Sequence, residues 1–177
     1  HPPERAKADA YDYDVDSVVL ADQLGYHEAW IGEHFTAVWE NIPCPDLFIA
    51  NALARTRNIR LGTGVSCMPN HNPLMLAQRS AQLDQLARGR FNWGVGSGGF
   101  PGDFELFGIN PDAGEHLEYT RAALDLVLQL WNDPRLGHNV LTARDLDISG
   151  FGRHGLLNSD YATIWQTGTP ERFLRSF

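Results

Sequence analysis

The chain has 177 residues, of which 43% are hydrophobic, enough for one soluble globular domain with a buried core. Its formal net charge is −8, with 14 Lys and Arg side chains and no basic run, so nucleic acid is not an expected partner. Cys44 and Cys67 form no Cys-x-x-Cys pair, which argues against a disulfide framework and favours a reducing, cytoplasmic setting. No apolar run approaches the roughly 20 residues that span a bilayer, so no membrane association is expected.

Helical and strand patterns alternate along the first two-thirds of the chain. Apolar residues at helical spacing, with Gly25 as a stop signal and Asn72-Pro73 as a start signal, predict helices over residues 13–24, 45–54, 72–89 and 114–131. Short apolar runs predict strands over residues 29–31, 59–65 and 91–95. This alternation predicts an α/β fold with a parallel sheet, and both an open doubly wound sheet and a barrel fit it.

The alternation stops at Pro134. Residues 137–160 carry no strong helix or strand pattern, whereas residues 161–166 fit a strand and residues 170–177 fit the start of a helix.

Polar and glycine residues follow each predicted strand, where ligands bind in parallel α/β folds. His34 is the main catalytic candidate, because imidazole exchanges protons near neutral pH; the alternative is a histidine hydrogen-bonded at the rim of the fold. Glu33 is expected to be structural, and His71 is expected to be solvated in a polar loop. These residues lack the spacing of metal ligands, so we predict no metal site.

Gly94, Gly96 and Gly99 match the spacing G-x-G-x-x-G after the third predicted strand. A dinucleotide site would need a helix to begin at once, but the long predicted helix begins only near residue 114. We therefore interpret the glycines as allowing the backbone to approach a bulky planar ligand, with a tight strand exit and no ligand as the alternative.

The chain contains, in this order, LADQLGYHEAWIGEH (20–34), RLGTGV (60–65), HNPLMLA (71–77), LDQLARGRF (83–91) followed by Gly94-Val95-Gly96, and DFELFG (103–108). In this order and spacing, these segments resemble the bacterial luciferase-like flavin-dependent monooxygenases, and among the branches the limonene-monooxygenase-like group. The resemblance covers residues 1–134, whereas residues 135–177 match the family poorly. It implies one partial luciferase-like domain over residues 1–177, of the (β/α)8 TIM-barrel type.

The resemblance also implies a reaction. Family members bind reduced FMN supplied by a separate flavin reductase, and O2 adds to the flavin to give a peroxyflavin that oxygenates a small organic substrate. His34 matches the catalytic histidine beside the reactive flavin carbon. A deazaflavin-dependent oxidoreductase of the same fold and a non-catalytic flavin-binding protein are the alternatives, and the sequence does not identify the substrate.

The expected flavin-binding residues lie in two segments. Val65 and Ser66 match the place where the family often has a cis peptide under the flavin ring, and Gly96, Ser97 and Gly98 match the flavin-contacting exit of the fourth strand. The luciferases have an arginine where this chain has Ser97, so we expect no strong cationic contact there.

The resemblance has two further implications. The helices over residues 44–54 and 72–86 would form the interface of a homo- or heterodimer. A complete barrel needs roughly 250 residues, and the first strand, two middle strands and the phosphate-binding segment are not found, so we expect a longer parent chain. Gly168-Thr169-Pro170-Glu171 resembles a stretch near the family's C-terminus.

Overall fold

The computed structural model describes residues 4–40 and 42–133. The elements predicted at 161–166 and 170–177 lie outside these residues, as does the whole segment 134–165. Helices and strands alternate, as predicted, in the order α1 (Lys7–Gln23), β1 (Glu28–Ile31), α2 (Pro45–Arg55), β2 (Arg60–Thr63), β3 (Ser66–Cys67), the 3-10 turn η1 (Met68–Asn70), α3 (Pro73–Ala87), β4 (Phe91–Asn92), β5 (Val95–Gly96), α4 (Pro101–Phe107) and α5 (Glu115–Asn132).

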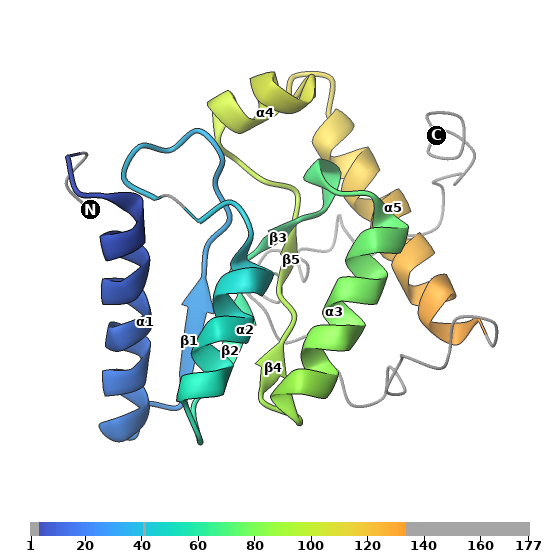
Figure 1. Cartoon of the computed structure of the whole chain (residues 1–177). Coiled ribbons are helices and arrows are strands. Elements are labelled where there is room, and N and C mark those ends of the chain that lie inside the picture. Colours follow the sequence, from blue (N-terminus) through green and yellow to red (C-terminus); the bar gives the residue numbers. More distant parts are fainter. Residues whose placement is uncertain (1–3, 41, 134–177) are drawn as a thin grey trace.

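The strands form parallel pairs, which confirms the predicted parallel sheet. In the order β1-β2-β4, Ala29 pairs with Leu61 and Leu61 with Phe91, whereas β3 pairs with β5 through Ser66 and Val95. In Figure 1 the arrow of β1 points upward, and the loop that follows it and α4 both lie at that upper end. The carboxyl ends of the strands therefore face the region where the sequence places its candidate site.

The predicted strand at 59–65 covers β2, with β3 beginning one residue beyond it, and the predicted strand at 91–95 is divided into β4 and β5. The Thr63 hydroxyl donates to the Gly94 carbonyl oxygen (2.8 Å) and accepts from the Gly94 N–H (3.1 Å). A Cβ on Gly94 would stand 2.1 Å from the Thr63 carbonyl oxygen, so only glycine permits this approach. The Thr63 hydroxyl at the end of β2 thus bonds to the backbone in the gap between β4 and β5.

Trp30 lies across the face of the sheet that carries Gly62 and Gly94. Gly62 pairs with Trp30 in the parallel register, and a Cβ on Gly62 would stand 2.5 Å from Cε3 of the indole. A Cβ on Gly94 would stand 3.3 Å from Cζ3 of the same ring. The indole therefore fits because Gly62 of β2 and Gly94, between β4 and β5, carry no side chain.

The helices bury the other face of the sheet. The fully buried side chains include Ile49 of α2, Leu61 of β2, Phe91 of β4 and Val127 of α5. Burying each such side chain contributes about 1.5–3 kcal/mol relative to leaving it exposed. Trp131 of α5 completes this core, since its indole N–H donates to the Ala77 carbonyl oxygen (2.9 Å).

Helix boundaries follow local signals where these exist. Asn72 caps α3 by accepting the Met75 N–H (3.1 Å), as the Asn72-Pro73 start predicts, and Gly25 has a φ of +81° just after α1. The sequence missed α4, because seven residues are too few to show a helical period. The described residues contain no helix that is long and apolar enough to cross a membrane.

Candidate active site

Three loops that follow strands meet at the carboxyl edge of the sheet. The pairing of β3 with β5 places Cys67 beside Gly96, and the Gly64 N–H donates to the Ile31 carbonyl oxygen at the end of β1 (2.7 Å). A Cβ on Gly96 would stand 2.7 Å from Cγ2 of Val65. The structure thus brings together the predicted site segments after residues 31, 63 and 95, which are far apart in the sequence.

His34 lies between two carboxylates in the loop after β1. Its Nε2 is 2.9 Å from Glu40 Oε2, and its Nδ1 is 3.4 Å from Asp103 Oδ2. Nδ1 is buried and makes no well-oriented hydrogen bond, although 29% of the side chain is exposed. The edge of Phe100 packs against the imidazole at a centroid distance of 5.6 Å. Carboxylates only accept hydrogen bonds, so the ring can serve both carboxylates only when both nitrogens carry protons.

Asp103 holds the loop that carries His34. Its Oδ1 accepts the Phe35 N–H (3.2 Å), the Thr36 N–H (2.9 Å) and the Thr36 hydroxyl (2.7 Å). Burial would raise the pKa of Asp103, but these hydrogen bonds and the contact with His34 outweigh burial and lower the pKa. Asp103 is therefore a buried carboxylate in the first turn of α4 that faces the Nδ1 side of the imidazole and fixes its position.

The sequence did not identify Asp103 or Glu40 as partners of His34. Asp103 begins the DFELFG segment, which was noted only as part of the family pattern. Glu40 lies six residues after His34 in the same loop, whereas Asp103 lies far along the chain, and no local motif marks either acid as a partner.

Val65 and Ser66 present backbone to the site. A cis peptide joins Gly64 to Val65, one bond before the expected Val65–Ser66 position. The Ser66 side chain is buried, and its hydroxyl accepts the Trp93 indole N–H (3.2 Å). Only the main chain of Ser66 is left for a ligand.

Gly96, Ser97 and Gly98 form the exit from β5. The close approach at Gly96 is to Val65, which gives a reason within the protein for a glycine that we had assigned to ligand contact. The Ser97 hydroxyl donates to the Gly98 carbonyl oxygen (3.4 Å), and Gly98 has a φ of +76°, where glycine is favoured. No atom lies within 4 Å of the position that a Cβ on Gly99 would occupy.

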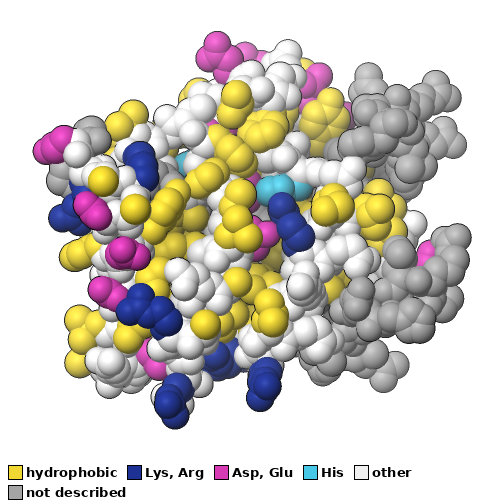
Figure 2. Space-filling view, viewed as in Figure 1, with side chains coloured by type: hydrophobic (Ala, Val, Ile, Leu, Met, Phe, Trp, Pro, Cys, Tyr) yellow, Lys and Arg dark blue, Asp and Glu magenta, His cyan; other side chains and the backbone are white. Residues whose placement is uncertain are grey.

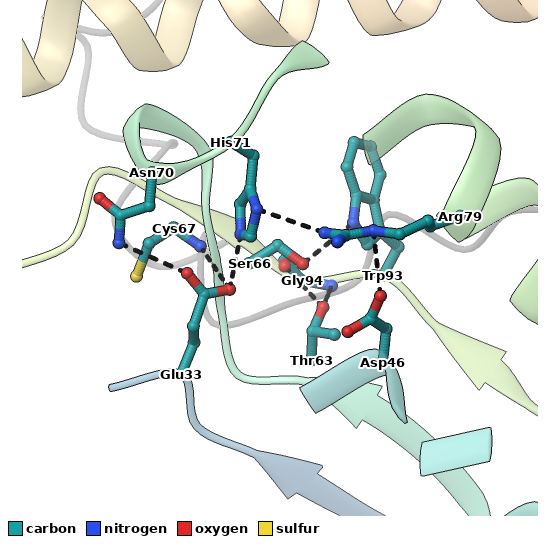
Figure 3. Close-up of polar contacts among 10 residues, drawn as sticks. All are labelled: Glu33, Asp46, Thr63, Ser66, Cys67, Asn70, His71, Arg79, Trp93 and Gly94. Carbon is teal, nitrogen blue, oxygen red and sulfur yellow. Dashed lines mark hydrogen bonds and ion pairs between the residues drawn. The ribbon is translucent and has the colours of Figure 1, made fainter. Parts of the chain in front are cut away.

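The prediction that His71 is solvated is wrong. Only 12% of its side chain is exposed, and its Nε2 lies 2.9 Å from Oε2 of Glu33, whose side chain is 1% exposed (Figure 3). His71 stands directly before Asn72, the cap of α3, and this position next to a helix start is the sequence feature that could have indicated a packed side chain.

Burial, together with the charges of Glu33 and Asp103, raises the pKa of the Cys67 thiol to about 12, so this cysteine is not a nucleophile.

Metal ligands do not gather anywhere in residues 4–40 and 42–133, because no group of three or more His, Cys, Asp or Glu side chains there could hold an ion.

Comparison with known proteins gives consistent results. Residues 1–150 match the family model described as luciferase-like monooxygenase. A 4-hydroxyprotoasukamycin monooxygenase of Streptomyces nodosus subsp. asukaensis is 47% identical over 117 residues, which cover 66% of this chain and 31% of that protein. A limonene 1,2-monooxygenase of Rhodococcus erythropolis is 40% identical over 113 residues, 62% of this chain and 29% of that protein.

A solved structure agrees with these sequences. The oxygenating constituent of 3,6-diketocamphane monooxygenase of Pseudomonas putida, a type II Baeyer-Villiger monooxygenase in complex with FMN, superposes with a TM-score of 0.70 at 32% identity. The match covers 74% of this chain and 36% of that one, so this chain spans about a third of the length of such relatives. The described residues are thus part of a (β/α)8 barrel, and the chain belongs to the luciferase-like monooxygenase family.

Proposed function

We propose that this chain supplies the flavin-binding edge of an FMN-dependent monooxygenase, which oxygenates a small organic substrate with O2. The observation that carries this proposal is His34, held between Glu40 and Asp103 in the same loop cluster as the cis Gly64–Val65 peptide and the β5 exit. The named relatives are monooxygenases, and one structural neighbour was solved with FMN, which supports the proposal.

The residues at this edge suit a planar cofactor. Val65 and Ser66 offer backbone, Gly96 and Gly98 carry no side chain, and the space beside Gly99 is open. An isoalloxazine ring can lie flat against such a backbone, and the partly exposed side chain of His34 lies in the same loop cluster. We propose Val65, Ser66, Gly96, Ser97 and Gly98 as the FMN-contacting residues.

When bound, reduced FMN would supply the activation of O2. His34 would hold or donate a proton beside the cofactor, and Asp103 would keep its ring oriented. Phe100 covers the imidazole and is itself packed against Trp39 at a centroid distance of 6.3 Å. These aromatic side chains would limit the access of water to the reacting atoms.

The proposed partners are O2, a small organic substrate and a separate reductase that delivers reduced FMN. A deazaflavin-dependent oxidoreductase would instead transfer hydride without consuming O2, and a non-catalytic flavin-binding protein would bind flavin without turnover.

Rapid mixing tests the proposal. The purified protein is mixed anaerobically with reduced FMN, O2 is added, and the absorbance of the flavin is followed. A shielded site predicts reoxidation at least tenfold slower than that of free FMN. Reoxidation at the rate of free FMN would contradict the proposal, and tight binding of a deazaflavin in its place would identify the alternative cofactor.

A further inference from the structure

Four charged or titratable side chains from four separate segments form a chain of contacts behind the candidate site. Glu33 follows β1, His71 precedes α3, Arg79 lies on α3 and Asp46 lies in the first turn of α2 (Figure 3). Glu33 Oε2 is 2.9 Å from His71 Nε2, His71 Nδ1 is 3.3 Å from a terminal guanidinium nitrogen of Arg79, and Arg79 Nε is 3.1 Å from Asp46 Oδ2. The proposed function assigns no role to these contacts.

The partners of His71 determine which ring nitrogen carries the proton. A guanidinium has only donors, so His71 Nδ1 must present a lone pair to Arg79. The carboxylate of Glu33 has only acceptors, so His71 Nε2 must present an N–H to it. Both contacts are satisfied together by one form alone, the neutral imidazole with its proton on Nε2.

Glu33 connects this histidine to the site. Besides His71, its oxygens accept the Cys67 N–H and the Asn70 side-chain amide, each at 3.4 Å. Glu33 thereby joins the loop after β1 to the segment after β3, and it is the residue directly before His34. The two longer contacts are weak, so the short His71 bond is the main partner of a carboxylate that is almost completely buried.

The space among these side chains is too small for a ligand. A cavity bordered by Glu33, Asp46, His71 and Arg79 has a volume of about 10 Å3, which is near the minimum for one water molecule. The contacts therefore have a structural rather than a ligand-binding geometry.

We infer that His71 is a positioning residue, held by Glu33 and Arg79 with its proton on Nε2 and a lone pair on Nδ1, and that it fixes Glu33 and thereby the loop that places His34. The tautomer follows from the contacts alone, whereas the effect on His34 rests on the proposed function. Removing the His71 donor would leave the Glu33 carboxylate buried without its best partner, and the loop would shift to solvate it.

The tautomer can be measured directly on the whole protein, without cofactor. Long-range 1H–15N NMR of protein with 15N-labelled histidine distinguishes a protonated ring nitrogen from one with a lone pair, and the His71 signals are assigned by their loss in His71→Gln. We expect a protonated Nε2 and an unprotonated Nδ1 near pH 7. A protonated Nδ1, or averaging between tautomers, would overturn the inference.

Two substitutions test the positioning role. Glutamine at position 71 retains one donor and one acceptor, so His71→Gln should keep flavin reoxidation and product yield within about twofold of wild type. His71→Leu removes both and should lower product yield at least tenfold, with reduced-FMN affinity changed less than threefold. Equal yields for the two variants would overturn the positioning role, whether both are active or both inactive.

Arg79→Leu is the alternative test if His71→Leu does not fold, because it leaves His71 in place. Glu33 still requires a proton on Nε2 in this variant, so Arg79→Leu should allow Nδ1 of His71 to carry a proton as well, whereas the control Gln82→Ala, on the exposed side of α3, should leave Nδ1 unprotonated. An Nδ1 that stays unprotonated in Arg79→Leu would contradict the role of the guanidinium. If the protein binds no flavin at all, the proposed function fails while the tautomer measurements still decide the contacts of His71.

Discussion

At the scale of single residues, two histidines differ because their neighbours differ. His34 faces a carboxylate oxygen at each ring nitrogen, whereas His71 faces a carboxylate at one nitrogen and a guanidinium at the other. In the first arrangement only the Nε2 contact with Glu40 is short (2.9 Å), and the second is satisfied by a ring with its proton on Nε2 and a lone pair on Nδ1. The same side chain is thus suited to proton donation in one loop and to fixed hydrogen bonding in the next.

Replacing His34 tests its proposed role in catalysis. Because the expected flavin contacts are mainly backbone, His34→Ala should still bind reduced FMN, with affinity within a fewfold of wild type. Product yield should fall by about 10²–10⁴-fold, the usual contribution of a positioned acid or base. Product analysis after single-turnover oxygenation makes the comparison, with the exposed His27→Ala as control. An unchanged yield would remove His34 from the mechanism.

At the scale of elements, the sequence predicted the order and type of the longer helices and all three strand regions. It did not predict the gap between β2 and β3, where the Thr63 hydroxyl at the end of β2 bonds to Gly94 in the gap between β4 and β5. The position of His34 at a strand end was predictable from the parallel fold, whereas its partners were not. Asp103 approaches His34 from a helix distant in sequence, whereas Arg79 lies only eight residues after His71, and neither contact follows from a local period.

Asp22 joins α1 to the turn before β2. Its carboxylate accepts the backbone N–H groups of Arg57 (2.8 Å), Asn58 (2.9 Å) and Ile59 (2.7 Å). Burial acts to raise the pKa of Asp22, but these three donors and the charge of Arg90 lower it overall. The carboxylate therefore caps this turn, whose backbone N–H groups make no hydrogen bonds within a helix or a strand.

Substitution of Asp22 should destabilise the fold in a pH-dependent way. Asp22→Ala should cost about 1 kcal/mol at pH 7, the lower end for lost hydrogen bonds, because solvent reaches this site. The folded-state pKa is lowered, so the stabilisation is complete above the unfolded pKa near 3.9 and is lost as the pH falls through the folded value. Urea unfolding of wild type and Asp22→Ala at several pH values measures the difference in the free energy of unfolding.

Asp16→Ala is the matched control, since Asp16 is an exposed residue of α1 paired only with Arg55 among its described contacts. Its effect should be below about 0.5 kcal/mol. A loss for Asp22→Ala that is no larger than this, or that grows on acidification, would contradict the capping role.

At the scale of the whole molecule, α2 and α3 leave apolar side chains on the surface. Leu47 of α2 is 70% exposed, and Met75 and Leu86 of α3 are 56% and 59% exposed. Figure 2 shows apolar side chains gathered on the face where Figure 1 draws α2 and α3. Apolar surface that recurs along neighbouring helices is typical of a protein–protein interface, as the expected dimer requires.

Dimer formation can be tested on this surface. Met75→Glu should convert a dimer into a monomer, because a charge would be buried in the apolar contact. Sedimentation velocity at several protein concentrations measures the assembly, and Leu20→Glu, an exposed position of α1, should leave it unchanged. A wild-type protein that sediments as a monomer at all concentrations would exclude this interface.

Trp30 and the glycines opposite it limit the order in which substitutions can accumulate. A side chain at Gly62 would collide with the indole, and its Cβ would also stand 3.0 Å from the main-chain carbonyl oxygen of Asn92, so a smaller residue at position 30 removes only the first obstacle. Position 94 is more restricted still, because a Cβ there would stand 2.1 Å from the main-chain carbonyl oxygen of Thr63, which no substitution removes. A paired change at positions 30 and 62 therefore also needs a small shift of the Asn92 backbone, whereas glycine at position 94 is a fixed requirement.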